Sequence, residues 1–501
     1  MTRWHFNGPA ALVPALLFAA VVAMPPMNHD VAAVLSFAER WLAGEVLYVD
    51  LIDVNPPLIF VLNLLPAGLA RWLGVDAVAA LKACLMAMVL AMWALSLLVR
   101  DRAAEPPVTR AVLDVLPGLV GFGSGYDFGQ RETMMAALAV PYLLAAVRRA
   151  EGGRPRGRMA AAALAALGFA LKPHFLVIPA LVELAVLAGA WRRRGRAAVR
   201  DPVPWVMAAV WAAYAMSLPL VFPQYLGSVV PLVMDLYLDN GGQTPWGLLL
   251  MPRMGTVLML VVPLSVLAWR QAAALPRVLA LAAIGALVSA LAQHKGWSYH
   301  IMPVELFGLS LGVVLGAGAL DRMGARPRGA SALLAWLFSL YLVSEGEAPW
   351  NQIIWTRSDA YILSGVLRAE AGGERVLVLS PGIAPAYPAL NYARARMTLR
   401  TMNIWLLEGA YRTCPASGAR YREPWEMGRP EFFMFRTVAE DFARAPPAAV
   451  VVDNWSAIPD CNGQAFNLID YFSRHPLFAE MWRHYAPTAR QGRFQVYTRT
   501  D

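Results

Sequence analysis

Long apolar runs separated by short charged connections constrain this chain more than any other feature of its sequence. A helix needs about 20 mainly apolar residues to cross the hydrocarbon core of a bilayer. Only 15% of the residues are charged and 58% are hydrophobic, whereas soluble proteins carry about 25% charged residues. We therefore expect an α-helical polytopic membrane protein with about eleven spans. The apolar runs lie near residues 9–24, 76–99, 111–124, 133–147, 159–171, 173–190, 203–222, 247–269, 278–293, 301–320 and 329–344.

The distribution of basic residues predicts which connections face the cytoplasm. The segment from Pro57 to Val75 is apolar enough to span, so its placement decides the orientation of everything that follows. If this segment lies on or dips into the outer face, nineteen basic residues fall in inner connections and five in outer ones. If it crosses, the later Arg clusters face outward and violate the positive-inside rule. We therefore predict that this segment does not cross and that the N-terminus is cytoplasmic. We expect the protein to lie in a bacterial inner membrane.

The C-terminal third of the chain has a different pattern from the rest. Short apolar runs at 375–380, 447–453 and 493–499 predict buried strands, and helical stretches lie between them. We therefore expect a transmembrane module at 1–344. A soluble α/β domain at 345–501 should follow it on the periplasmic side.

The three cysteines differ in their expected surroundings. Cys84 lies within an apolar run, where it is expected to be a packing residue. Cys414 and Cys461 both lie in the domain placed outside the cytoplasm. In an oxidising compartment two such cysteines usually pair, so we predict a disulfide between them.

Composition and motifs also exclude several classes of partner. The net charge is +9, but the basic residues are nearly all Arg and occur in short clusters between apolar runs. That pattern is typical of orientation signals and does not indicate a nucleic-acid partner. No Walker A loop and no G-x-G-x-x-G fingerprint follows a strand, so ATP and dinucleotide chemistry have no support.

Polar side chains gather at the predicted outer ends of the spans. Ionisable groups at membrane depth are costly and usually mark a functional site. Interfacial snorkelling is the alternative for any single residue. Because the residues come from at least five connections on one face, we favour a single outward-facing cavity. They are His29, Asp30, Asp50, Asp53, Asp127, Arg131, Glu132, Lys172, His174, His294, Lys295 and His300.

The first outer loop is the most informative of these connections. Asn28-His29-Asp30 directly follows the first span, and an amphipathic helix is predicted from Val31 to Leu42. An acid held at the end of a span, under a membrane-surface helix, suits a general base beside the lipid headgroups. The alternative is that Asp30 is the N-cap of that helix, and the two roles are compatible.

The same loop carries a resemblance to a known family. The run HDVAAVLSFAERWLAGEVLYVDLIDVNPPLIF, residues 29–60, resembles the first periplasmic loop of the GT-C membrane glycosyltransferases. These include the protein O-mannosyltransferases and the aminoarabinose transferases of lipid A. Their loop has an acid after the first span, a helix, a G-x-x-x-Y-x-D-like stretch and a Pro-Pro-Leu turn. In that family the segment after the turn runs along the membrane, in agreement with the placement predicted from the basic residues.

Three later segments extend the resemblance over about residues 9–320. The second outer loop ends in Arg131-Glu132, where Glu132 matches the second acid of the family. The hairpin tip at Lys172 is similar to the family's Lys-Pro turn, and HKGWSYHIMP at 294–303 is similar to its late periplasmic motif. Glu replaces the commoner Asp in the second loop, and Asn55 stands where Lys or His often precedes the Pro pair. These departures leave the role of each position open.

The resemblance implies transfer of a sugar from a polyprenyl-phosphate donor to a lipid, glycan or protein acceptor at the outer face. Asp30 would be the base and Glu132 would orient a sugar. For Asp53 and Asp127, shaping of the loops is the alternative we favour; for Arg253 a buried structural pair is equally compatible. The donor phosphate would contact Arg131, Lys172, Lys295, His300 and Arg253, and the sugar or acceptor would contact His29, Asp53, Asp127 and Tyr299.

Other interpretations of the sequence remain. No cluster of His, Cys and carboxylates has a clear metal-binding spacing, although His29, Asp30 and Glu132 are a candidate set for a divalent cation. We therefore predict no cofactor. A transporter or flippase would show repeated halves with sites near mid-membrane, which the sequence lacks. A non-catalytic protein of polysaccharide assembly would not require acids at Asp30 and Glu132.

Overall fold

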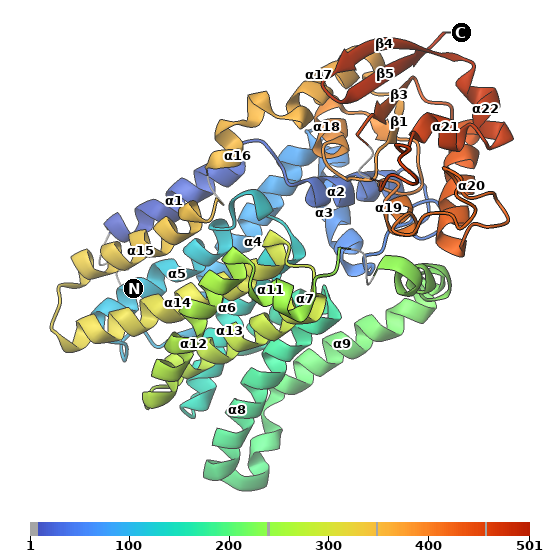
Figure 1. Ribbon diagram of the computed structural model, residues 1–501. Coiled ribbons are helices and arrows are strands. Elements are labelled where there is room, and N and C mark those ends of the chain that lie inside the picture. Colours follow the sequence, from blue (N-terminus) through green and yellow to red (C-terminus); the bar gives the residue numbers. More distant parts are fainter. Residues whose placement is uncertain (1–8, 238–240, 347–348, 456–457, 501) are drawn as a thin grey trace. The chain divides into compact units, whose positions relative to one another are not determined.

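The computed structural model describes residues 9–237, 241–346, 349–455 and 458–500 (Figure 1). The chain forms two compact units. The helical unit consists of residues 1–26, 82–217 and 241–353, and the mixed unit of residues 27–81, 218–240 and 354–501. The expected boundary at residue 344 lies near the last junction. Two earlier segments nevertheless belong to the same unit as the C-terminal domain.

Each of the eleven predicted apolar runs forms a helix. Most have a Pro or Gly at or beyond their ends, where the chain turns. The helices are α1 (Pro9–Ala23), α4 (Ala77–Val99), α5 (Pro107–Phe122), α6 (Arg131–Ala150), α7 (Arg158–Ala170), α8 (Val177–Arg194), α9 (Pro202–Val221), α12 (Pro252–Arg270), α13 (Ala274–Gln293), α14 (Ser298–Arg322) and α15 (Pro327–Ser344). Shorter elements of this unit are η1 (Gly125–Asp127), η2 (Pro173–Leu176), η3 (Gly195–Arg200), α11 (Pro245–Leu249) and α16 (Trp350–Ile353).

Within the described ranges, seven helical segments are long and apolar enough to cross a membrane. They are α4, α6, the segment 173–200 that contains α8, α9, α12, α13 and α14. α6 and α14 are almost entirely enclosed by other side chains, whereas α9 exposes most of its apolar surface. Exposed apolar surface of this extent on a helix requires a lipid environment or a partner. The helical unit is therefore compatible with a multi-pass membrane protein.

One end of the helical unit joins the connections that carry most of the arginines, and we call it the arginine end. Arg148, after α6, lies 3.0 Å from Asp101, after α4. Arg149 lies 2.8 Å from Asp201, after α8. Asp321, at the end of α14, accepts hydrogen bonds from the backbone N–H groups that begin α5. Connections after alternate helices therefore meet at one end, as the basic residues predict.

The opposite end, which we call the glutamate end, joins the remaining connections. Lys172, at the tip of the α7–α8 hairpin, contacts Glu132 at the start of α6 and Gln293 at the end of α13. Lys82, near the start of α4, donates a hydrogen bond of 2.5 Å to the carbonyl of Met24, just beyond α1. The chain therefore leaves α1 and enters α4 at the same end. That the segment after the Pro pair does not cross a membrane stays a prediction.

The mixed unit has a five-stranded sheet in the order β2-β1-β3-β5-β4. β1 pairs in parallel with β2 and β3, and β5 pairs antiparallel with β3 and β4. The strands are β1 (Arg375–Leu379), β2 (Arg396–Met397), β3 (Ala449–Asp453), β4 (Tyr485–Gln491) and β5 (Phe494–Arg499). Three of these were predicted. β2 has only two residues and β4 alternates polar and apolar side chains around a proline, so neither gives a continuous apolar signal.

Helices of the mixed unit come from three separate parts of the chain. α2 packs against α3 and against α18, which follows β1 (Figure 1). The elements are α2 (His29–Leu42), α3 (Leu58–Leu73), η4 (Tyr225–Val229), α10 (Val230–Leu232), η5 (Val233–Tyr237), η6 (Trp355–Arg357), α17 (Asp359–Ala371), α18 (Ala386–Ala393), α19 (Leu406–Ala410), α20 (Arg429–Arg444), α21 (Leu468–Phe472) and α22 (Pro476–Trp482).

Two features stabilise the C-terminal part of the mixed unit. All five residues of β3 are buried, so this central strand forms the floor of the core. Cys414 and Cys461 form a disulfide with a Cα–Cα distance of 5.4 Å, which confirms the predicted pair. Because 47 positions separate the two cysteines, the bridge closes a long loop and restricts the unfolded chain strongly.

Candidate functional site

A buried carboxylate lies at the centre of the glutamate end. Glu132 is in the first turn of α6 and is fully buried. Its Oε1 lies 2.5 Å from the Lys172 Nζ, and the same ammonium contacts the Gln293 Oε1 at 2.9 Å. A buried charge is tolerated only when it is paired and hydrogen-bonded. The hairpin tip therefore supplies the counter-charge that makes an ionised Glu132 possible at this depth.

Aromatic residues from the start of α14 close the cluster around Glu132. The His300 Nε2 lies 3.8 Å from the Glu132 Oε1. Its ring centre lies 4.6 Å from that of Tyr299 and 5.2 Å from that of Trp297. The Lys172 Nζ also lies 5.6 Å from the centre of the Tyr299 ring. The start of α6, the α7–α8 tip and the α13–α14 connection thus meet in one cluster.

Three polar atoms of this cluster are buried without a hydrogen-bond partner among the described residues. They are the Oε2 of Glu132, the Nε2 of His174 and the Nδ1 of His300. An unsatisfied buried polar group costs about 1–3 kcal/mol. Such groups normally contact water or a ligand, or mark a catalytic role. Together they indicate that the cluster is built to receive polar groups from outside the chain.

Two further cations and one acid surround the cluster. Arg131 and Lys295 are both buried, and the Lys295 Nζ lies 4.9 Å from the centre of the Trp297 ring. Asp127 is also buried and accepts a hydrogen bond of 3.2 Å from the Ser298 hydroxyl. Asp127 therefore ties η1 to the start of α14, which agrees with a shaping role. The region therefore brings together basic side chains of the kind that bind anionic ligands.

Arg253, predicted as a contact of the donor phosphate, pairs with a carboxylate of the protein. Its Nε and Nη2 atoms donate to the two carboxylate oxygens of Glu305 at 2.8 and 2.7 Å. Glu305 lies within α14 and is fully buried. A two-point pair of this kind joins α12 to α14 and satisfies a carboxylate that would otherwise be buried alone. Arg253 therefore fits the structural alternative, and we do not assign it to the donor phosphate.

In the mixed unit, Asp30 lies in the first turn of α2 and is not its N-cap. The helix begins at His29, and the side chain of Asn28 accepts a hydrogen bond of 2.9 Å from the Asp30 backbone N–H. The N-cap alternative for Asp30 is therefore wrong, because Asn28 has this role. The carboxylate of Asp30 lies 3.6 Å from the His29 Nε2. Its position in the first turn is favourable for a negative charge, since the helix dipole is positive there.

Asp53 has a local structural role. Its Oδ1 accepts hydrogen bonds from the backbone N–H and the side-chain amide of Asn55, at 2.9 and 2.6 Å. The Tyr48 hydroxyl donates a hydrogen bond of 2.6 Å to the carbonyl of the same Asn55. Aspartates commonly form such turns with the backbone two residues ahead. The loop before the Pro pair is therefore held by Asp53, in agreement with the shaping alternative.

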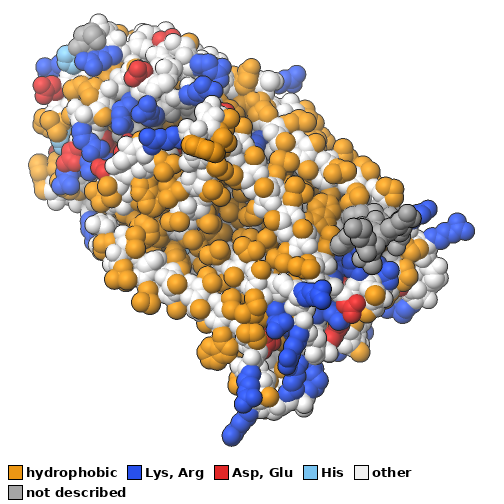
Figure 2. Space-filling model, turned by 180° about the vertical axis from the view of Figure 1, so that it is seen from behind, with side chains coloured by type: hydrophobic (Ala, Val, Ile, Leu, Met, Phe, Trp, Pro, Cys, Tyr) orange, Lys and Arg blue, Asp and Glu red, His pale blue; other side chains and the backbone are white. Residues whose placement is uncertain are grey.

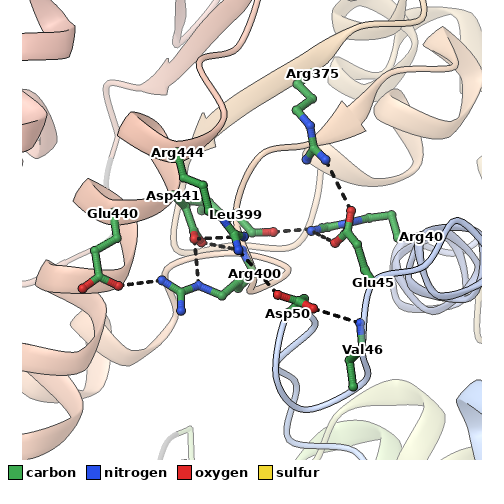
Figure 3. A network of polar contacts seen from close by, with 10 residues as sticks. All are labelled: Arg40, Glu45, Val46, Asp50, Arg375, Leu399, Arg400, Glu440, Asp441 and Arg444. Atoms are coloured by element: carbon green, nitrogen blue, oxygen red, sulfur yellow. Dashed lines mark hydrogen bonds and ion pairs between the residues drawn. The ribbon is translucent and has the colours of Figure 1, made fainter.

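A polar network fixes the first loop to the C-terminal part of the mixed unit (Figure 3). Arg40 is buried in α2 and binds Glu45 through two nitrogens, while its third donates to the carbonyl of Leu399. Arg400 pairs with Asp441 at 2.7 Å. A single arginine on an otherwise apolar face of the predicted helix was a usable signal for this network.

The mixed unit also has a cavity of about 570 Å³ beside α2, α3 and α18. Charged residues of both signs line it, among them Glu39, Arg71, Asp76, Arg394 and Arg396. Desolvation at the cavity wall and the neighbouring carboxylate of Asp76 raise the pKa of Glu39 to about 7, although Arg396 opposes the shift and part of the residue is exposed. Glu39 can therefore exchange a proton near neutral pH, which the sequence alone did not reveal.

The candidate residues divide between the two units. Glu132, Arg131, Lys172, Lys295, His300, Tyr299, Asp127 and Arg253 belong to the helical unit, and Asp30, His29 and Asp53 to the mixed unit. No group of three or more His, Cys, Asp or Glu side chains is arranged to hold a metal ion within the described ranges. His174 and Gln293 join the cluster in addition to the residues assigned from the sequence.

A scan against protein-family models and a search of curated proteins found no match to this chain.

Proposed function

We propose that this protein is a membrane glycosyltransferase that moves a sugar from a polyprenyl-phosphate donor to a lipid, glycan or protein acceptor. The observation that carries the proposal is the buried Glu132, paired with Lys172 and with one oxygen left for another partner. Buried acids of this kind are rare in membrane proteins and usually functional. The resemblance of the first loop and of the later motifs to GT-C enzymes supports the same conclusion.

The chemistry requires two kinds of group, and the candidate residues include both. The leaving group is a phosphate, whose developing charge needs cations more than it needs a proton. Arg131 and Lys295 are buried cations near Glu132, and Lys172 is a third cation, paired with Glu132 itself. The acceptor hydroxyl needs a base, and we propose Asp30 of the mixed unit for this role.

The remaining assignments follow from the contacts within each unit. Glu132 would accept a hydrogen bond from a sugar hydroxyl through its Oε2, while His300 and His174 would donate or accept through their unpartnered nitrogens. Tyr299 offers a ring face for a sugar or an isoprenoid. His29 would contact the acceptor beside Asp30. No metal is part of the proposed mechanism. The proposed topology has about eleven spans, with the glutamate end outside the cytoplasm.

The test is a transfer assay with purified protein in nanodiscs. A labelled pool of polyprenyl-phosphate sugars is incubated with the protein and with membrane, glycan or protein acceptors, and labelled product is measured. Asp30→Asn should lower turnover by about 100-fold or more while donor binding is retained, since this is the usual range for a general base. Asp359→Asn is the matched control, because Asp359 is also an acid in the first turn of a helix of the mixed unit.

Two outcomes would contradict the proposal. Near-normal turnover of Asp30→Asn would remove Asp30 from the reaction. Transbilayer movement of labelled lipid without sugar transfer would favour a transporter, for which the buried Glu132–Lys172 pair is also suitable. Donor binding gives a separate measure: Lys295→Met should weaken it about ten-fold, as loss of a charge-assisted contact does.

A further inference from the structure

The arginine end has a polar cavity of about 270 Å³ that the proposed reaction does not use. Two connections form it, one between α6 and α7 and one between α8 and α9. Figure 2 shows basic side chains gathered at the lower end in that view, where α8 turns into α9. The cavity is lined by five arginines and one aspartate, together with small side chains; the charged residues are Arg149, Arg154, Arg158, Arg194, Arg200 and Asp201.

The acids near this cavity are already committed to one arginine. Arg149 donates to Glu183 at 2.6 Å and to Asp201 at 2.8 Å. The other four arginines make no ion pair with any residue that the structure describes, and Arg158 has only a weak contact of 3.4 Å with the Pro155 carbonyl. Four guanidinium groups around one small cavity create a positive potential that favours binding of an anion. The cavity is therefore suited to an anionic ligand.

The surroundings of the cavity place it at the level of the lipid headgroups. Trp191, in the last turns of α8, is 49% exposed, and Trp205, in the first turn of α9, is 65% exposed. The indole of Trp205 donates a hydrogen bond of 2.9 Å to the carbonyl of Val199 between the two helices. Exposed tryptophans at the ends of spans are typical of the membrane–water interface. α8 and α9 continue from there with exposed apolar surfaces such as Leu184 and Leu220.

We propose that this cavity binds the headgroup of an anionic phospholipid. The phosphate would lie between Arg154, Arg158 and Arg194, where guanidinium groups can bind it through paired hydrogen bonds. The acyl chains would lie on the exposed apolar faces of α8 and α9. Basic pockets between spans are the usual receptors for such headgroups.

The position of the cavity also gives the lipid an effect on the glutamate end. Arg158 begins α7 and Arg194 ends α8, so both lie at the base of the helical hairpin whose tip carries Lys172. An anion that holds these two arginines together opposes separation of α7 from α8. A bound lipid therefore stabilises the hairpin that positions Lys172 against Glu132.

The test uses delipidated full-length protein and two triple variants of equal charge. Arg154→Gln/Arg158→Gln/Arg194→Gln removes three arginines of the cavity. Arg192→Gln/Arg193→Gln/Arg196→Gln is the matched control, because it removes three exposed arginines that do not line the cavity. Binding of phosphatidylglycerol and phosphatidylcholine is measured by native mass spectrometry, and thermal stabilisation by each lipid is measured in mixed micelles.

The expected result is specific for both the lipid and the site. Phosphatidylglycerol should bind the wild-type protein at least ten-fold more tightly than phosphatidylcholine and should raise its melting temperature. The cavity variant should lose about ten-fold or more of this affinity, whereas the control should lose less than about three-fold, since diffuse attraction to each surface arginine is weak.

Three results would overturn the proposal. Equal losses in the two variants would show that the attraction is diffuse and that the cavity has no special role. Equal affinity of the wild-type protein for both lipids would exclude headgroup recognition. This comparison uses only the wild-type protein, so it does not depend on whether a variant folds. Saturable binding of inorganic phosphate at the concentration that displaces phosphatidylglycerol would assign the cavity to a free anion instead of a lipid.

Discussion

The two ends of the helical unit both carry basic side chains, but these side chains differ in burial and in pairing. At the glutamate end, Lys172, Arg131 and Lys295 are buried or nearly so, and the structure surrounds Lys172 with a carboxylate, an amide and a ring. At the arginine end, Arg154 and Arg194 are exposed and lie in a cavity where arginines outnumber acids. The same kind of charge is thus compensated in one place and accumulated in the other.

The difference shows how burial determines what a charge can do. In a low-dielectric interior a charge must be paired, so its partners are fixed by the fold. Near water, screening allows like charges to gather and act together on a lipid surface or ligand. Arg100 shows that burial matters more than position. It lies at the arginine end but is buried, and it pairs with both Glu105 and Asp114.

The strongest test of the comparison is whether the two ends face opposite sides of the membrane. Ala104 is exposed in the connection at the arginine end, and Gln243 is exposed and bonded through its backbone to His294 near the glutamate end. In a Cys84→Ser background, a membrane-impermeant thiol reagent should label Ala104→Cys from one side of the membrane only. It should label Gln243→Cys only from the other side. We expect Gln243→Cys to be labelled from outside. Labelling of both positions from one side would break the assignment of the ends.

The next largest effect concerns the buried pair. Lys172→Met should lower the free energy of unfolding by about 3–5 kcal/mol, because it leaves the Glu132 carboxylate buried without its counter-charge. Adding Glu132→Gln should recover much of this loss, since the second change removes the stranded charge. Titration of the micellar protein with SDS gives both values. A double variant no more stable than Lys172→Met would mean that the two groups do not interact.

The disulfide provides a test of which end faces the oxidising compartment. The chain leaves α15 at the glutamate end and continues into the segment that holds Cys414 and Cys461. Replacing both cysteines with serine should destabilise the mixed unit by about 3–4 kcal/mol on the chain-entropy estimate. Intact-mass analysis of the unreduced chain should show two protons fewer than the reduced chain. Two freely alkylated thiols in native protein would count against both the bridge and an outward glutamate end.

The smallest effect is expected from a single exposed arginine. Arg192→Met at the end of α8 should change the free energy of unfolding by no more than about 0.5 kcal/mol, because the side chain is exposed and pairs with no described residue. The same SDS titration provides the comparison with Lys172→Met. A loss as large as that of Lys172→Met would mean that exposed and buried cations contribute alike, and the contrast between the ends would fail.

Much of the fold followed from patterns with a simple physical origin. Apolar runs predicted the helices. β1 and β3 stood out because their side chains are apolar on both faces, and β5 because buried apolar residues alternate along it. The sidedness of the connections followed from the arginines alone, and the contact of Lys82 with Met24 supports the same alternation. The eleven-span count is less secure from the sequence, because α1, α5 and α7 are each shorter than a full crossing.

The candidate site was only partly predictable. Ionisable residues at span ends indicated a site. No sequence pattern predicted the ion pairs of Lys172 with Glu132 and of Arg253 with Glu305. Those partners are far apart in sequence and depend on helix packing. His174 and Gln293 are similarly distant from Glu132 along the chain. Asn28 was adjacent to Asp30, and its preference for N-cap positions was a usable signal.

The discontinuous make-up of the mixed unit has a consequence for biosynthesis. Arg40 and the carbonyl of Leu399 that it binds are 359 residues apart. At about 5–20 residues per second, the ribosome needs roughly 20–70 seconds to supply the second partner after the first. During that time α2 emerges without α18, which later packs against it, while α4 to α15 are synthesised. We therefore expect the apolar surface of α2 to rest on the membrane or on a chaperone until the last third of the chain arrives.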